Sequence, residues 1–572
     1  MSGGSVGPFR NEDEWGLARW LVKNAGHTQI ESFLKLPIIN QKVDPSFGNK
    51  KHLLSMVDSL PAGVAWKCHD MIIKGDIPDL DKDPSGKTMR SEHLELWYRD
   101  PVECVRELIG NPMLREGMRY APERVYEDKE GKNQIIDEMW TASWWWDVQR
   151  QLPIGATIAA IILSSDKTLL SNFRGDNSAW PVYLTIGNIP KEIRRKISAH
   201  ASILVGYLPI PKFDCFSDKT RSLAKYRLFH FCMEKILNAL IKAAAADGID
   251  MTCADGWIRK IWPILAAYVA DYPEQCLIAC CKENRCPFCL VDPKARGEHQ
   301  PATGEPRSKK DTLFFLDRKT AGENDTAFTT WGLRDVPSPF WRNLPFTNIF
   351  TAFTPDLLHQ LHKGVFKDHL VKWCMEILSD EVIDDLFRSA PSHHGLRHFK
   401  NGISHVSQWT GTEHKEMERV FLGLIASHPK TDRRVIEAVR AVIDFIFYAS
   451  LQQQTTKSLF ALRHSLETFH RLKDVFLELG GRSGDHFNIP KIHSLQHYDT
   501  LMELFGSADG YNTELPERLH IDYAKNAFRA SNRKDYIAQM TRWLERQEAV
   551  DRFAQFLEWK QVRDKLSQLP ED

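Results

Sequence analysis

Three acidic residues at the edges of apolar segments carry the strongest chemical signal in the sequence. Asp166 ends the run ATIAAIILSSD, Asp271 ends IWPILAAYVAD, and Glu517 opens the helix-like stretch ERLHIDYAKNAF. A carboxylate that follows a buried strand is held at the rim of a sheet, and three that meet there favour a hard cation such as Mg²⁺ or Mn²⁺. Two such ions held by shared carboxylates can cleave and join phosphodiesters. The sequence predicts such a site, against the alternative of ordinary surface carboxylates at strand ends and helix starts.

A cysteine cluster, CLIACCKENRCPFC, follows the second acid. Cys286 and Cys289 form a C-P-F-C turn, which can present two thiolates to one Zn²⁺. Cys280 or Cys281 could be a third ligand, and no second C-x-x-C is present, so the remaining ligand must come from another part of the chain. Simple buried thiols or a redox pair are the alternatives, although no thioredoxin-like context surrounds the motif. We predict a structural zinc site that includes Cys281, Cys286 and Cys289.

Histidines at helical spacing are candidates for the missing zinc ligands. In TPDLLHQLHKGVFKDH, Asp356, His359 and His362 lie three residues apart and share a helix face. Either histidine could complete the zinc shell, lie near the catalytic metals, or form surface hydrogen bonds. His493 and His497 in KIHSLQHY also share a face, but the glutamate of H-E-x-x-H is absent. That pattern favours core or interface histidines for the second pair.

The segments around the first two acids predict a particular order of strands. ATIAAIILSS, WPVYLTIGNI and HASILVGYLPIP are β-branched or aromatic-rich runs separated by turn residues, which predicts three consecutive strands. A long helix follows in SLAKYRLFHFCMEKILNALIKAAAADG, with Gly248 as its stop signal. A short strand in IDMTCADG and an apolar strand ending at Asp271 come next. This is the order of an RNase H-like core, which needs acids on its first and fourth strands, where Asp166 and Asp271 fall.

These patterns predict an α/β protein, α+β overall, with four regions. Residues 1–150 form a mainly helical, Trp-rich region, and residues 151–290 form the first part of an RNase H-like core that ends in the C-x-x-C cluster. Residues 291–480 form a polar loop followed by an all-helical insertion. Residues 481–572 are helical and return Glu517 to the core.

Composition limits the kinds of function that fit the chain. With 75 Lys plus Arg and 75 Asp plus Glu residues the formal net charge is zero, so DNA contact must come from local basic patches. KEIRRK (191–196) and RASNRK (529–534) are candidates, and either could equally be a solvated face. The N-terminus has no apolar signal region and no apolar run is long enough to span a membrane. The nucleotide-binding motifs G-x-x-x-x-G-K-[ST] and G-x-G-x-x-G are absent, and no obvious G-x-S-x-G elbow between a strand and a helix supports an acyl hydrolase, which disfavours NTPases, dinucleotide enzymes and acyl hydrolases.

Several blocks in order resemble the Plavaka transposases of fungi, which are close to the CACTA-type cut-and-paste elements. The blocks are ILSSDKTLLS, AWPVYLTIGNI, ILAAYVADYPEQCLIACCKENRCPFC, FTPDLLHQLHKGVFKDHL, ISHVSQWTGTE, FNIPKIHSLQHY and NTELPERLHIDYAK. The resemblance implies an RNase H-like core with a DDE triad, split by a helical insertion. The family's D-x-P element matches Asp271-Tyr272-Pro273, its C/D-x-x-H element matches Asp356 to His359, and its E-R pair matches Glu517-Arg518.

The resemblance also implies partners and cofactors. The implied cofactors are two Mg²⁺ or Mn²⁺ ions, and the implied partner is DNA, in the form of terminal inverted repeats and target DNA. The resemblance further implies a nuclear location, no contact with a membrane, and a homo-oligomer. Asp255 competes with Asp271 for the second acid, and Glu514 competes with Glu517 for the third. Asp356 is a further candidate. Because the N-terminal zinc finger expected of the family is not visible, we expect a fragment or a degraded copy.

Two other functions stay open from the sequence. One is a transposase-derived DNA-binding or interaction protein whose catalysis has lapsed, which the neutral net charge favours slightly. The other is a zinc-stabilised helical scaffold without a DNA role.

Overall fold

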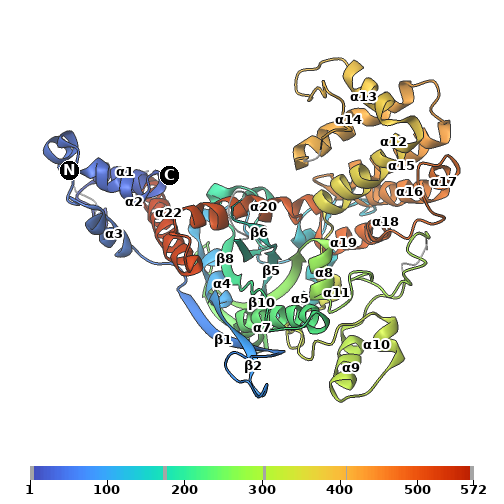
Figure 1. The fold of residues 1–572 in the computed structure, drawn as a ribbon. Helices are drawn as coiled ribbons and strands as arrows, with labels where there is room; N and C mark the ends of the chain where they lie inside the picture. The colour runs from blue at the N-terminus through green and yellow to red at the C-terminus, as the bar shows by residue number, and fades with distance from the viewer. Residues whose placement is uncertain (1–5, 172–176, 246, 300–303, 407–408, 567–572) are drawn as a thin grey trace.

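The computed structural model describes five stretches of the chain. They are residues 6–171, 177–245, 247–299, 304–406 and 409–566. Within them a mixed β-sheet lies at the centre, and helices cover both of its faces (Figure 1). None of the described helices has the length and apolar character that crossing a bilayer requires. The sheet and its helices confirm the α/β class.

Four strands form the middle of the sheet in the predicted order. β5 (Thr157–Ser165), β7 (Ser178–Ile186) and β8 (Ile203–Leu208) pair antiparallel in succession, and β10 (Ile258–Val269) pairs parallel with the far side of β5. The order β8-β7-β5-β10 is the one expected of an RNase H-like core. Every residue of β5, β7 and β8 is buried, because helices cover both faces, which explains why these strands have apolar rather than alternating sequences.

The sheet continues beyond this centre on both sides. A long hairpin of β1 (Trp66–Pro78) and β2 (Met89–Arg99) joins β8, β9 (Ile249–Thr252) joins β10, and β6 (Thr168–Leu169) pairs with β7. The hairpin lies in the region 1–150, for which the sequence pattern indicated mainly helices. β1 alternates between exposed and half-buried residues, and Met71 and Ile73 on its half-buried side pack against the core. This period of two is typical of a strand, and the prediction of mainly helices for 1–150 missed it.

Two groups of helices enclose the sheet. α4 (Pro101–Gly110) and α7 (Asp218–Ala245) contact each other and pack on one face. The other face carries the C-terminal segment, in which Leu519, Phe528 and Leu544 pack against Tyr183 and Tyr207 of the strands. This segment comprises α20 (Glu514–His520), η8 (Ile521–Asn526), α21 (Ala527–Arg529) and α22 (Tyr536–Leu566).

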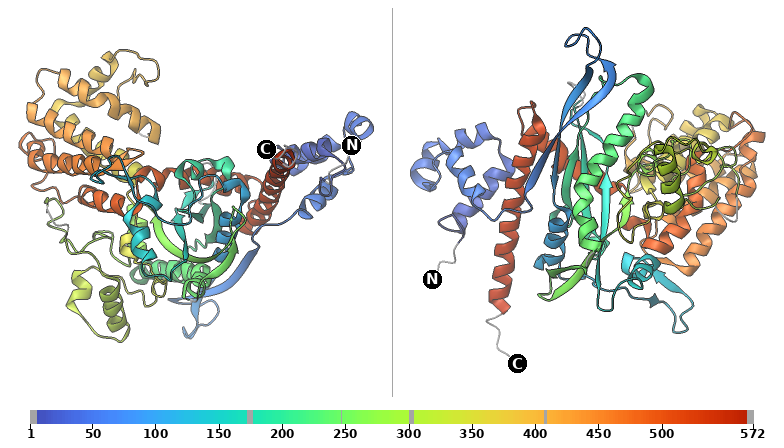
Figure 2. Two further views of the ribbon diagram at one scale, coloured as in Figure 1. Left: turned by 180° about the vertical axis from the view of Figure 1, so that it is seen from behind. Right: turned by 90° about the horizontal axis from the view of Figure 1, so that it is seen from below.

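The N-terminal helices form a separate small cluster around α22. Trp15 and Phe47 pack against Val550 and Phe553, so the two ends of the described chain meet there. Figure 2 shows these helices and α22 on one side of the strands and the helical insertion on the other. The helices of this cluster are α1 (Glu12–Asn24), α2 (His27–Leu34), η1 (Ile39–Val43) and α3 (Lys50–Asp58). Short elements between the hairpin and the long helix α7 are η2 (Pro112–Leu114), β3 (Val125–Tyr126), β4 (Gln134–Ile136), η3 (Met139–Thr141), α5 (Ser143–Gln149), α6 (Lys191–Arg194) and η4 (Ile197–Ala199).

A large, mainly helical segment separates β10 from α20. The stretch 291–330, expected to be a loop, contains α9 (Lys309–Thr320) and α10 (Thr326–Thr330), and its residues 300–303 lie outside the described part of the chain. The other elements are α8 (Tyr272–Ile278), α11 (Ile349–Ala352), η5 (Leu357–Val371), α12 (Lys372–Leu378), α13 (Asp380–Ser389), α14 (Gly411–Ser427), α15 (Arg433–Ala449), β11 (Gln454–Thr455), α16 (Thr456–Leu472), α17 (Val475–Glu478), α18 (Pro490–Ser494), η6 (Leu495–His497), α19 (Tyr498–Phe505) and η7 (Ala508–Gly510).

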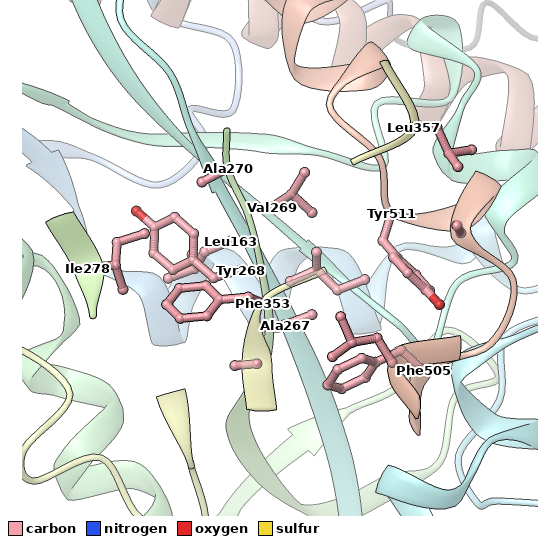
Figure 3. Close-up of a cluster of buried hydrophobic side chains, with 14 of the residues drawn as sticks. Leu163, Ala267, Tyr268, Val269, Ala270, Ile278, Phe353, Leu357, Phe505 and Tyr511 are labelled. Carbon is pink, nitrogen blue, oxygen red and sulfur yellow. The ribbon is translucent and has the colours of Figure 1, made fainter. Parts of the chain in front are cut away.

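The insertion and the sheet share one apolar core. The largest cluster of buried side chains runs from Leu94 to Tyr511. Figure 3 shows Leu163 and Val269 of the sheet in one cluster of buried side chains with Leu357 of η5 and Phe505 of α19. The insertion therefore packs directly against the end of the sheet where Asp166 and Asp271 lie.

Candidate active site and metal centre

The first two acids leave neighbouring strands at the same end of the sheet. β5 and β10 are parallel, and Ser164 pairs with Val269. Asp166 and Asp271 each follow two residues after that pair, so both carboxylates lie at one rim. Burial and the nearby charge of Asp166 raise the pKa of Asp271, although its Oδ1 accepts a hydrogen bond of 3.0 Å from the backbone N–H of Glu274, which lowers it. Two carboxylates that repel each other in this way favour a shared cation.

A histidine on α20 contacts the first acid. His520 Nε2 lies 3.4 Å from Asp166 Oδ2, and its Nδ1 lies 3.0 Å from the hydroxyl of Tyr183 on β7. His520 is buried, whereas the side chain of Asp166 is 40% exposed. Tyr183 and His520 therefore orient Asp166 from behind while leaving its carboxylate accessible to a ligand.

The third acid lies one helical turn before His520 on the same helix. Glu517 Oε1 lies 3.0 Å from His359 Nε2 and the Glu517 side chain is 41% exposed. His359 Nδ1 lies 3.1 Å from Asp356 Oδ2 and 3.1 Å from Thr513 Oγ1. Burial alone would lower the pKa of His359, but its hydrogen bonds to the two carboxylates and their charges raise it to about 10. A protonated His359 therefore links Asp356 to Glu517.

These contacts connect all three predicted acids. α20 reaches Asp166 through His520 and carries Glu517 itself. The charge of Asp356 also raises the pKa of Asp271 and the charge of His359 lowers it, so the Asp356–His359 pair lies near the second acid. The structure thus brings Asp166, Asp271 and Glu517 to one end of the sheet, with Asp356 and His359 beside them.

The two competing acids lie in other surroundings. Asp255 precedes β10, and so lies at the opposite end of that strand from Asp271, where it forms a 2.8 Å ion pair with Arg259. Twelve strand residues span about 40 Å. Glu514 pairs with Lys415 of α14 and points towards the insertion. The geometry favours Asp271 over Asp255 and Glu517 over Glu514.

A fourth acid near the site was missed by sequence reasoning. The buried Glu274 carboxylate accepts hydrogen bonds from Ser165 Oγ and, at 3.3 Å, from Trp180 Nε1. Burial raises its pKa well above the usual value. Because Ser165 and Trp180 lie on β5 and β7, Glu274 ties the start of α8 to both strands. Its position three residues after Asp271 suggests only an acid in the first turn of a helix, so no sequence pattern pointed to this role.

Four buried side chains form a candidate metal centre away from the acids. The ligand atoms of Cys286, Cys289, His493 and His497 all lie within 4.8 Å of one another. Cys286 Sγ is 3.4 Å from His497 Nε2, and Cys289 Sγ is 3.2 Å from His493 Nε2. Hydrogen bonding with Cys286, and then with His493 and His497, lowers the pKa of the Cys289 thiol. Two thiolates and two imidazoles are a donor set that fits tetrahedral Zn²⁺.

The other predicted zinc ligands lie outside this group. His359 belongs to the acid cluster, His362 Nδ1 is 2.8 Å from Glu418 of α14, and Cys281 lies in a bridge to Leu333. The second pair of ligands comes instead from α18 and η6, where His493 and His497 were expected to be core histidines. Cys289 and His493 are 204 residues apart, and no local pattern links them.

Comparisons with known proteins are consistent with the order of these motifs. The family model described as Plavaka transposase matches residues 47–374, more than half of the chain. The matched part contains β5, β10, the C-P-F-C turn and the D-x-x-H element, and it ends before α20. A search of curated proteins found no match.

Proposed function

The chain belongs to the Plavaka transposase family, and on this basis we propose that it cleaves and joins DNA strands with a DDE triad of Asp166, Asp271 and Glu517. Membership of the family implies an activity of the nuclease or transferase kind. The observation that carries the finer proposal is the in-register placement of Asp166 and Asp271 at one rim, with Glu517 on the helix that contacts Asp166.

In this proposal the three carboxylates bind the metal ions, and two histidines orient the carboxylates. Asp166, Asp271 and Glu517 would hold two Mg²⁺ or Mn²⁺ ions. Such ions, when bound, would supply activation of the attacking oxygen and neutralisation of charge on the leaving oxygen. His520 and His359 orient Asp166 and Glu517 by hydrogen bonds, so that both carboxylates are in place before the substrate arrives.

We assign the second centre a structural role. Cys286, Cys289, His493 and His497 would hold one Zn²⁺, and four protein ligands leave no open position for chemistry. The site joins the segment that follows Asp271 to the segment that leads to Glu517. Zinc there would therefore fix the second acid relative to the third.

DNA is the partner that the family implies. Its terminal inverted repeats and target DNA are the proposed substrates, and a nuclear location and a homo-oligomer rest on the family alone. Of the two basic runs, 191–196 has Lys191 and Arg194 buried against Asp509 and Glu138. The run 529–534 is mostly exposed between α21 and α22 and is the better candidate for phosphate contact.

A cleavage assay tests the proposal. The substrate is a labelled duplex that carries the inverted-repeat end flanking the gene, incubated with the full chain and Mg²⁺. We expect a nick at the repeat terminus and joining to a target plasmid, both lost in Asp166→Asn and both retained in Asp255→Asn. DNA binding without a nick in the wild-type chain would instead support the catalytically lapsed alternative.

A further inference from the structure

A cavity of about 720 Å³ lies beside the acid cluster, between the sheet, the insertion and α20. Ser164 and Val269 line it, and each lies two residues before one of the two strand acids. β5 and β10 end at Ser165 and Val269, just before the two acids, so the cavity adjoins the rim of the sheet at which Asp166 and Asp271 lie. The proposed mechanism does not use this space.

The wall of the cavity is largely apolar and partly aromatic. Tyr183 of the sheet, Tyr511 after η7 and Phe447 of α15 line it together with aliphatic side chains such as Ile446 and Leu519. Phe447 is 60% exposed, although most large apolar side chains of α15 are buried. An exposed aromatic ring at a cavity mouth provides a surface on which a flat ring can stack.

Cations from two elements stand around the same opening. Lys415 and Arg419, one turn apart on α14, line the cavity, and so does Arg518, which directly follows Glu517. Their side chains are 40%, 59% and 53% exposed. Each pairs with a carboxylate at least partly open to solvent, and such surface pairs are weak enough for a phosphate to compete.

From these features, and resting on the proposed function, we propose that the cavity receives one unpaired nucleotide of the DNA strand held at the acids. The base stacks against Phe447 and Tyr511, and the adjoining phosphate is bound by Lys415, Arg419 and Arg518. The volume is that of a pocket for a ligand of nucleotide size. The combination of an aromatic wall and a basic rim matches a base joined to a phosphate.

Two matched DNA duplexes test the proposal by affinity. They share one sequence, the inverted-repeat end, and one carries a single unpaired 5-iodouracil next to the expected nick. Anisotropy with Ca²⁺ measures binding without cleavage. We expect the wild-type chain to bind the unpaired probe more tightly than the paired one. Phe447→Ala or Arg419→Ala should lower the affinity for the unpaired probe by about tenfold and change the affinity for the paired probe little. The controls Phe460→Ala and Arg433→Ala, at exposed residues outside the cavity, retain the preference.

Photocross-linking locates the base directly. Ultraviolet light couples iodouracil to adjacent aromatic rings, and mass spectrometry should find the adduct on Phe447, Tyr511 or Tyr183. Equal affinity for both probes, or an adduct outside the cavity, overturns the inference. If Mg²⁺-dependent nicking persists while both results are negative, only the cavity assignment fails, whereas absence of nicking with a correctly placed adduct rejects the triad alone.

Discussion

The acid cluster and the Cys₂His₂ cluster are built alike but differ in access to solvent. Each joins residues that follow β10 or β5 to residues on a helix late in the chain. In the acid cluster Asp166 and Glu517 are partly exposed and are held by histidines from behind. In the Cys₂His₂ cluster all four ligands are buried, and their ligand atoms lie within 4.8 Å of one another. The first centre is therefore open to solvent, and the second is closed.

The two centres therefore contribute differently to the protein. At the first centre, burial and then the charge of Asp166 raise the pKa of Asp271, so its charged form is disfavoured there unless a cation binds. A closed site of thiols and imidazoles instead gains folding free energy when metal binds. Substitutions at the first centre should therefore affect catalysis, and those at the second should affect stability.

The largest effect is expected at the open centre. Asp271→Asn should lower the rate of DNA cleavage by about a thousandfold, because one bridging metal ligand is lost. The melting temperature should stay the same or rise, since burial and Asp166 disfavour the charge and asparagine still caps α8. Single-turnover cleavage and thermal unfolding measure the two effects. A large fall in the melting temperature of Asp271→Asn would contradict the view that substitutions at the acids affect catalysis and not stability.

At the closed centre the stability effect should dominate. Cys289→Ser, or treatment with a strong chelator, should remove one zinc per chain and lower the free energy of unfolding by on the order of several kcal/mol. Zinc content by mass spectrometry and denaturant unfolding are the measurements. Cys281→Ser is the matched control, because Cys281 lies outside the group and should leave zinc bound. Wild-type protein without zinc would disprove the assignment.

The sequence predicted the three acids of the first centre but only the cysteine half of the second. Asp166 and Asp271 were found because each directly follows an apolar strand, and Cys286 and Cys289 because they form a tight local turn. Helical spacing showed that His493 and His497 share a face, but spacing cannot show what that face meets across 204 residues. His359 and Glu274 illustrate the same limit, since their roles depend on packing and not on local pattern.

A smaller effect on metal binding is expected at the histidine behind the first acid. His520→Asn removes the contact with Asp166 Oδ2, and side chains that orient metal ligands are worth roughly 10- to 100-fold in affinity. Mn²⁺ binding followed by electron paramagnetic resonance, without DNA, should weaken by that range. His464→Ala, at an exposed histidine on α16, serves as control. Unchanged Mn²⁺ affinity would show that His520 has a packing role only and does not orient Asp166.

The smallest effect on metal affinity is expected at Tyr183, which contacts His520 and not the acid itself. Tyr183→Phe removes the hydroxyl that lies 3.0 Å from His520 Nδ1, and a single hydrogen bond is worth about 1 kcal/mol, or roughly fivefold in Mn²⁺ affinity. Tyr207→Phe is the control, because Tyr207 packs on the same face but its hydroxyl donates to the carbonyl of Tyr523. If Tyr183 acts through His520, the double variant Tyr183→Phe/His520→Asn binds Mn²⁺ no more weakly than His520→Asn alone. Additive losses would mean that Tyr183 reaches the open centre by another route.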